Sequence, residues 1–191
     1  MVGEGKGVYM KELSLFSGAG GGLLASKHLL GWRTIGYVEN EKHPQKVIAA
    51  RIKDGLLDEA PIFTDIREFN GQGYAGSYKG LVDVVSGGFP CQDISCAGRG
   101  EGLDGSRSSL WFAMLDTIRI VGPRFVFVEN SPLLRLRGLN TVLKGLACIG
   151  YDARWGCLSA AQAGAKHKRN RMWLVAHSRC RSGGHDCPQT S

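Results

Sequence analysis

Cys91 stands in a setting that suits a nucleophile. It follows a glycine-rich run at 86–90 (SGGFP) and begins a long polar, glycine-rich stretch over 92–109. Structural cysteines are usually buried among apolar residues, whereas a loop thiolate can attack an electrophilic carbon. The pattern therefore favours a catalytic Cys91 in the loop of an enzyme. Composition alone fits a chance loop cysteine equally well.

Charged residues near the end of the chain could assist such a nucleophile. Glu129 follows an apolar run at 125–128, and a carboxylate at the end of a buried strand can serve as a general acid. Glu129 and Asn130 could equally form only a turn. Arg169 and Arg171 are two apart, so on a strand both would face one side and could stabilise negative charge. The alternative is a solvated strand face.

The amino-terminal part carries a turn that suits a nucleotide-like cofactor. Residues 16–22 (FSGAGGG) follow an apolar run and open a helical pattern. Glycines let the backbone turn tightly and bring N–H groups to a ligand. Their spacing departs from the dinucleotide fingerprint, so a smaller nucleoside cofactor fits as well as a nicotinamide or flavin. Glu39 could accept hydrogen bonds from ribose hydroxyls, and Asp65 from an adenine amine, unless Asp65 only caps a turn.

Short β-branched runs alternate with helical patterns along the chain. Strands are expected at 13–16, 34–38, 62–63, 81–86 and 125–128, with a closing pair at 151–158 and 172–176. Helices are expected at 23–30, 43–54, 110–120 and 138–149. This order predicts an open, mostly parallel, doubly wound α/β sheet with helices on both faces. Ligands bind at the carboxyl edge of such sheets, where these polar residues fall: Ser17, Glu39, Asp65, Cys91 and Glu129.

Composition predicts one globular domain over 1–176 and a flexible polar tail over 177–191. No apolar run is long enough to cross a membrane and the amino terminus lacks a signal-peptide core, so we expect a cytoplasmic protein. The net charge of +7 either attracts phosphate backbones or simply aids solubility. The cysteines are irregularly spaced, and the late Cys180, His185 and Cys187 match no standard zinc site. We therefore expect reduced thiols and no metal.

Taken together, these motifs resemble the catalytic domain of the cytosine-C5 DNA methyltransferases, in the family's order from about Leu13 to Ala176. Residues 16–22 resemble the cofactor loop, and 88–92 (GFPCQ) resemble the nucleophile motif. Residues 95–110 resemble the catalytic loop and the helix start after it. Glu129-Asn130 matches the Glu-Asn pair, and 169–171 (RNR) match the paired arginines.

The resemblance implies the fold of methyltransferases that use S-adenosyl-L-methionine, and methylation of double-stranded DNA as in restriction–modification. Cys91 would attack C6 of a flipped cytosine, Glu129 would bind N3 and the 4-amino group, and Arg169 or Arg171 would hold O2. Gln92, Ser95 and Asn130 would bind the substrate. The cofactor, which leaves as S-adenosyl-L-homocysteine, would contact Phe16, Ser17, Gly18, Ala19, Gly20, Gly21, Glu39, Asn40, Asp65, Ile66, Pro90 and Leu110.

One part of the resemblance is missing. In the family a target-recognition domain and a carboxy-terminal helix follow the paired arginines, and none of the residues after Arg171 resembles them. We therefore expect a chain that acts only with a partner supplying recognition, or a truncated product. A cofactor- or DNA-binding subunit without catalysis, or the same chemistry on RNA, stays open at this point.

Overall fold

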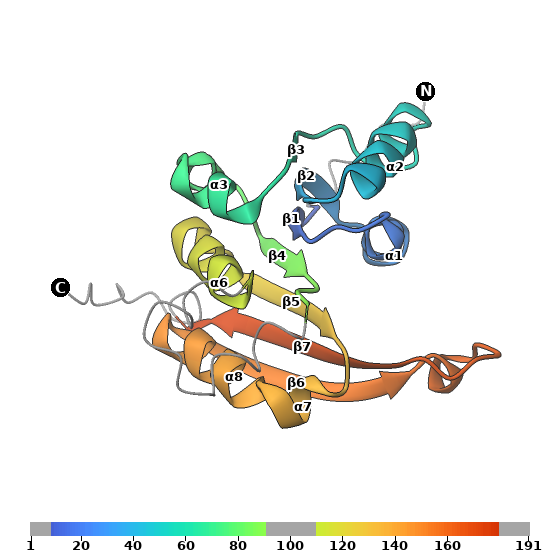
Figure 1. The fold of residues 1–191 in the computed structure, drawn as a ribbon, viewed down its shortest axis with the longest axis vertical. Helices are drawn as coiled ribbons and strands as arrows, with labels where there is room; N and C mark the ends of the chain where they lie inside the picture. Colours follow the sequence, from blue (N-terminus) through green and yellow to red (C-terminus); the bar gives the residue numbers. More distant parts are fainter. Residues whose placement is uncertain (1–8, 91–109, 180–191) are drawn as a thin grey trace.

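A seven-stranded sheet forms the centre of the molecule (Figure 1). The computed structural model describes residues 9–90 and 110–179. The strands are β1 (Lys11–Leu15), β2 (Arg33–Val38), β3 (Ile62–Phe63), β4 (Val84–Gly87), β5 (Phe125–Asn130), β6 (Tyr151–Ser159) and β7 (Asn170–Ser178). They pair in the order β3-β2-β1-β4-β5-β7-β6. The first five are mutually parallel and β7 is antiparallel to both of its neighbours, so the predicted sheet with its closing antiparallel pair is confirmed.

Helices cover both faces of this sheet. They are α1 (Gly21–Leu30), α2 (Lys42–Lys53), α3 (Ile66–Gly71), α6 (Leu110–Val121), α7 (Leu134–Arg137) and α8 (Leu139–Cys148), with 3₁₀ turns η1 (Tyr74–Tyr78) and η3 (Ala161–Ala163). Figure 1 shows α1 and α2 on one side of β1, β2 and β4, with α3 and α6 on the other. The alternation of strand and helix in the sequence therefore gives the doubly wound arrangement that it predicts.

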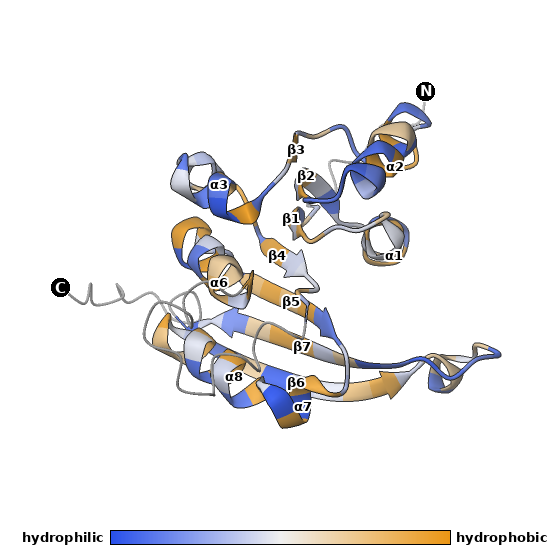
Figure 2. Ribbon diagram, in the orientation of Figure 1, coloured by the Kyte–Doolittle hydropathy of each residue, from blue (hydrophilic) through white to orange (hydrophobic). Residues whose placement is uncertain are grey.

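The main hydrophobic core lies between the sheet and α6. Trp111, Met114 and Ile118 of this helix are fully buried against the strands. Figure 2 shows apolar residues on both α6 and β5. Along β5 the buried Val126 and Val128 alternate with residues that face the α1 side, because successive strand side chains point to opposite faces.

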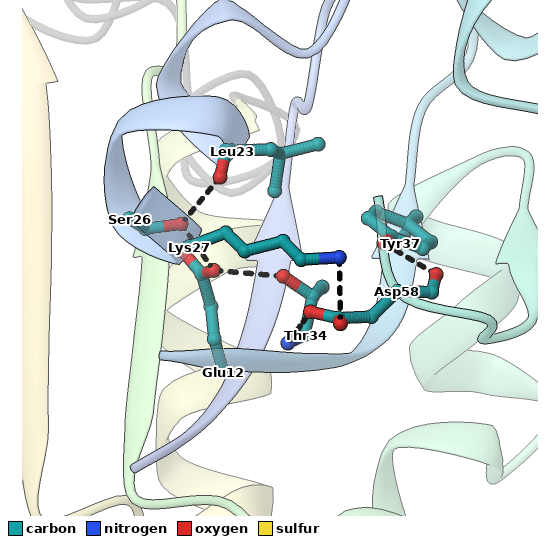
Figure 3. A network of polar contacts seen from close by, with 7 residues as sticks. All are labelled: Glu12, Leu23, Ser26, Lys27, Thr34, Tyr37 and Asp58. Atoms are coloured by element: carbon teal, nitrogen blue, oxygen red, sulfur yellow. Dashed lines mark hydrogen bonds and ion pairs between the residues drawn. The ribbon is translucent and has the colours of Figure 1, made fainter. Parts of the chain in front are cut away.

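Polar contacts attach α1 and the loop after α2 to β2 (Figure 3). Lys27 in α1 forms an ion pair with Asp58, 3.1 Å from nitrogen to oxygen, and the Thr34 backbone N–H donates to the same carboxylate. Burial, together with the nearby Asp58 carboxylate, raises the pKa of Tyr37 to about 12. Its hydroxyl donates to the Asp58 carbonyl at 2.8 Å. These contacts hold α1 and the loop after α2 in place against β2.

Some boundaries differ from the sequence prediction. The predicted strand at 81–86 begins only at Val84, because Leu81 closes a turn by donating its N–H to the Tyr78 carbonyl. The helices α3 and η1 occupy 66–78, for which no element is predicted. Strand β7 continues to Ser178, two residues beyond the predicted domain end, since Ser178 pairs with Tyr151. The division into domain and tail stays a prediction, because 180–191 lie outside the described residues.

Within residues 9–90 and 110–179, no helix is long and apolar enough to cross a bilayer.

Candidate active site at the carboxyl edge of the sheet

Two adjoining cavities open at the carboxyl ends of the parallel strands. The smaller has a volume of about 360 Å³ and the larger about 870 Å³. Phe16, just after β1, and Gly88, just after β4, line both. A ligand in one cavity would therefore lie beside a ligand in the other, with Gly88 between them.

The smaller cavity brings together residues from the ends of four strands. Seven of the predicted cofactor residues line it: Phe16, Glu39, Asn40, Asp65, Ile66, Pro90 and Leu110. Its walls include aromatic and aliphatic side chains, and its carboxylates can accept hydrogen bonds from hydroxyl or amine groups. A flat base attached to a ribose suits this combination.

Glu39 anchors the loop after β1. Its side chain is buried and accepts the Gly18 N–H at 2.7 Å and the Glu41 N–H at 2.8 Å. Phe16 has a φ of 53°, which is uncommon for a residue with a side chain, and Gly18 has a φ of 54°. The Glu39 carboxylate therefore stabilises a tightly turned loop before any ligand binds.

The turn divides the predicted cofactor residues between the two cavities. Ser17, Gly18, Ala19 and Gly21 line the larger cavity rather than the smaller. Gly20 lines neither, and lies at the start of α1 with a φ of 86°. Asp65 lines the smaller cavity and also caps α3 by accepting the Arg67 N–H at 2.7 Å. The cap is therefore confirmed, whereas acceptance of an adenine amine by Asp65 stays a prediction.

An ion pair stands in the larger cavity. Arg171 Nε contacts Glu129 Oε1, and the two side chains are 30% and 36% exposed, so both can reach a ligand. Arg171 lies two residues before Trp173, the strand partner of Glu129, which places it diagonally across the β5–β7 pair on the same face. Arg169 lines the same cavity but precedes the first residue of β7. Among the described residues, Arg171 is therefore the arginine that forms an ion pair with Glu129.

Two contacts that the sequence did not predict control this corner of the site. A Cβ atom on Gly88 would lie 3.1 Å from the Glu129 carbonyl oxygen and 3.2 Å from its Oε2. The buried Asn130 side chain donates to the Phe89 carbonyl at 2.9 Å. The only sequence signal for the close approach of Gly88 to Glu129 is a Gly-Gly pair after a strand. Asn130 thus fixes the backbone two residues before Cys91, and its direct binding of substrate stays a prediction.

Several predicted residues cannot be placed. Cys91, Gln92 and Ser95 lie outside the described residues, as do Cys180, His185 and Cys187. Pro90, the residue before Cys91 in the chain, lines the smaller cavity. In the part of the chain that the structure does describe, no group of three or more His, Cys, Asp or Glu side chains gathers as metal ligands would.

Comparison with protein families gives a match to C-5 cytosine-specific DNA methylase over residues 10–182. Among curated proteins, the type II methyltransferase M.CviJI of Paramecium bursaria Chlorella virus IL3A is 30% identical over 168 residues. The type II methyltransferase M.NgoBI of Neisseria gonorrhoeae is 28% identical over 172 residues. The matches cover 87% and 88% of this chain, but the chain spans only 42% and 50% of those relatives.

Solved structures show the same fold. A mutant of DNMT2 from Spodoptera frugiperda superposes with a TM-score of 0.69 at 15% identity, covering 95% of this chain and 54% of that one. A putative DNA modification methyltransferase encoded in an E. coli prophage gives 0.67 at 21% identity, covering 89% and 47%.

Two neighbouring glycines are expected to respond differently to a methyl group. A Cβ on Gly87 would meet the Leu15 carbonyl oxygen at 2.9 Å, a backbone atom that cannot turn away. We expect Gly87→Ala to lower the free energy of unfolding by about 1–3 kcal/mol. Gly88→Ala should cost less, about 1 kcal/mol, because its nearest contacts, the Glu129 carbonyl oxygen at 3.1 Å and the carboxylate at 3.2 Å, need to yield by only a few tenths of an ångström.

Denaturant unfolding measures both changes, and a crystal structure of the Gly88→Ala variant should show a displaced Glu129 carboxylate. Gly156→Ala is the control, since nothing lies within 4 Å of its added Cβ. Equal destabilisation by the three substitutions would contradict the described packing.

Proposed function

Because this chain belongs to the C-5 cytosine-specific DNA methylase family, we propose that it transfers a methyl group from S-adenosylmethionine to C5 of cytosine in double-stranded DNA. The observation that carries the proposal is the Glu129–Arg171 pair, held across Gly88 from a cavity of nucleoside size. This arrangement would place a carboxyl group and a cation beside a cofactor site, the two kinds of group that ring activation calls on.

The residues of the smaller cavity suit the methyl donor. When bound, the cofactor supplies a methyl group on a positively charged sulfur. Glu39 would accept the ribose hydroxyls with the lone pairs that Gly18 and Glu41 leave free, and Asp65 would accept the adenine amine. Phe16 and Leu110 would pack on the apolar parts. Gly88 would then keep the path to the larger cavity open.

The larger cavity suits the base that accepts the methyl group. The Cys91 thiolate would form a bond to C6 of a flipped cytosine, while Glu129 gives a proton or hydrogen bond to N3. Arg171 would orient Glu129 and stabilise charge at O2. The electron pair would pass to C5, which would take the methyl group as its bond to the cofactor sulfur breaks and S-adenosylhomocysteine leaves. Loss of the C5 proton to solvent would then restore the C5–C6 double bond, expel Cys91 as the thiolate and return the N3 proton to Glu129.

An apolar groove beside this site is the basis for proposing that a further polypeptide binds there. The larger cavity continues along α1, where Leu29 is 81% exposed, to Leu158, which is 57% exposed. Phe127 and Trp173 form its floor with stacked rings 5.4 Å apart. The chain also spans half or less of its relatives' length. We propose that a polypeptide carrying target recognition, in the same protein or in a second chain, covers this groove.

Glu39 should govern cofactor affinity. Replacing it with alanine removes the acceptor for ribose and the anchor of the Gly18 loop, so affinity for S-adenosylhomocysteine should fall roughly 10- to 100-fold in calorimetry. Glu41→Ala is the matched control, because it lines the same cavity and keeps the backbone N–H that Glu39 accepts. Equal losses in both variants would argue that general negative charge, not the Glu39 contacts, attracts the ligand.

Covalent trapping tests the chemistry itself. Duplex DNA carrying 5-fluorocytosine has no C5 proton to lose, so with S-adenosylmethionine it should leave the base bonded to the protein. We expect Cys91→Ala to abolish this adduct and Glu129→Gln to slow its formation by roughly 10²- to 10⁴-fold. Cys157→Ala, at an exposed cysteine outside both cavities, should leave the rate unchanged.

Other outcomes separate the rival functions. An adduct with fluorinated RNA but not with DNA would assign the same chemistry to a different substrate. Cofactor binding without any adduct would show that this chain alone does not catalyse transfer, as a binding subunit or a chain lacking its partner would behave. An adduct that survives Cys91→Ala would overturn the proposed nucleophile.

A further inference from the structure

A buried carboxylate lines the larger cavity and plays no part in the proposed chemistry. Glu12 of β1 is 2% exposed, and among the described residues it forms no ion pair with a lysine, arginine or histidine. Three hydroxyls donate to it instead. Ser86 Oγ lies 2.5 Å from Oε1, while Ser26 Oγ and Thr34 Oγ1 lie 2.8 and 2.9 Å from Oε2. Figure 3 shows the last two converging on Glu12 from α1 and β2.

Such a group is costly to bury. Removing a carboxylate from water without a cation costs several kcal/mol, which hydrogen bonds offset only in part. Two of the other buried residues of this strand, Leu13 and Leu15, are apolar, and the third, Ser14, is polar but uncharged. A valine or leucine would avoid the cost but would give up three directional bonds. The function of these three hydrogen bonds is therefore to be sought in the elements that they connect, α1, β2 and β4.

Two of these elements, α1 and β4, form two walls of the site. Ser26 belongs to α1, which begins directly after the cofactor loop, and Ser86 is two residues before Gly88, which lines both cavities. We propose that Glu12 is a positioning residue that fixes β4 and Gly88 relative to α1 and the cofactor loop. It would thereby align the methyl donor with its acceptor, so this inference rests on the proposed function.

Loss of the Thr34 hydroxyl and loss of the Ser86 hydroxyl should affect different contacts between elements. α1 and β2 are joined a second time, because Asp58 binds both Lys27 and the Thr34 backbone N–H (Figure 3). Between β4 and α1, by contrast, the link from Ser86 through Glu12 to Ser26 is the one hydrogen-bonded side-chain connection among the residues described, and β4 is otherwise held by its backbone pairing with β1. Removing the Thr34 hydroxyl should leave the two walls in place, whereas removing the Ser86 hydroxyl should loosen β4 relative to α1.

This contrast gives a matched pair of variants, Ser86→Ala and Thr34→Val. Each deletes one hydroxyl bond to Glu12 at a buried position. For Ser86→Ala we expect amide hydrogen exchange to rise roughly tenfold both at 86–90 and in the cofactor loop, and S-adenosylhomocysteine affinity to fall about fivefold. Thr34→Val should change each quantity less than about twofold. Hydrogen-exchange mass spectrometry and calorimetry on the whole chain measure them.

Two further variants test Glu12 directly. Glu12→Leu removes every acceptor and should show the full effect of Ser86→Ala at both segments. Glu12→Gln keeps one acceptor oxygen and an amide that can donate to a rotated hydroxyl, so it should restore most of the protection and affinity. Rescue by Gln is not expected if Glu12 only fills space. If Glu12→Leu does not fold, the Gln variant and the Ser86–Thr34 pair still decide the question.

The proposal is overturned if Ser86→Ala and Thr34→Val act alike, or if exchange rises uniformly over the chain. Either result would make the network a general support of the fold. If wild type does not bind S-adenosylhomocysteine, the proposed function fails. The exchange pattern of the unliganded chain still shows whether Glu12 couples the two walls, so the two failures are distinguishable.

Discussion

The close approach of β4 to Glu129 is the constraint on which the site depends. Parallel pairing places Gly87 beside Val128, so the next residue, Gly88, lies against Glu129 at the carboxyl edge. A Cβ at that point would press on Glu129 and displace it by a few tenths of an ångström. A glycine at 88 thus lets the Glu129 carboxylate approach the junction of the two cavities.

Strand direction supplies the second half of the arrangement. Because β7 runs antiparallel to β5, its amino end, not its carboxyl end, reaches the edge where the parallel strands finish. Arg171 therefore comes to Glu129 from a segment more than 40 residues further along the chain. The alternation of β5 directs Glu129 toward the α1 face and Asn130 toward the core, where it holds Phe89. One strand end thus positions both the Glu129 carboxylate and, through Asn130, the Phe89 backbone.

The sequence was informative wherever local pattern decides structure. Apolar runs and turn residues predicted every strand of the described sheet, and the order of elements predicted its parallel part. The boundaries near 66–84 were missed because Asp65 starts α3 through a cap and Leu81 is held in a turn, and neither contact has a strong periodic signal.

Long-range geometry was harder to predict. The division of the cofactor loop between two cavities follows from the backbone angles of Phe16 and Gly18, which no residue type dictates. Likewise, the choice between Arg169 and Arg171 depends on β7 beginning at Asn170, and the role of Gly88 depends on a neighbour 41 positions away. The Glu12 network joins four elements, β1, α1, β2 and β4, that only the fold brings together.

A crystal structure of this chain with S-adenosylhomocysteine would show whether the two cavities meeting at Phe16 and Gly88 hold the methyl donor and its acceptor. We expect the adenosine in the smaller cavity, with its ribose hydroxyls on Glu39 and its sulfur beside Gly88, facing the Glu129–Arg171 pair. Adenosine bound along α1 in the larger cavity, or a ribose away from Glu39, would contradict this expectation.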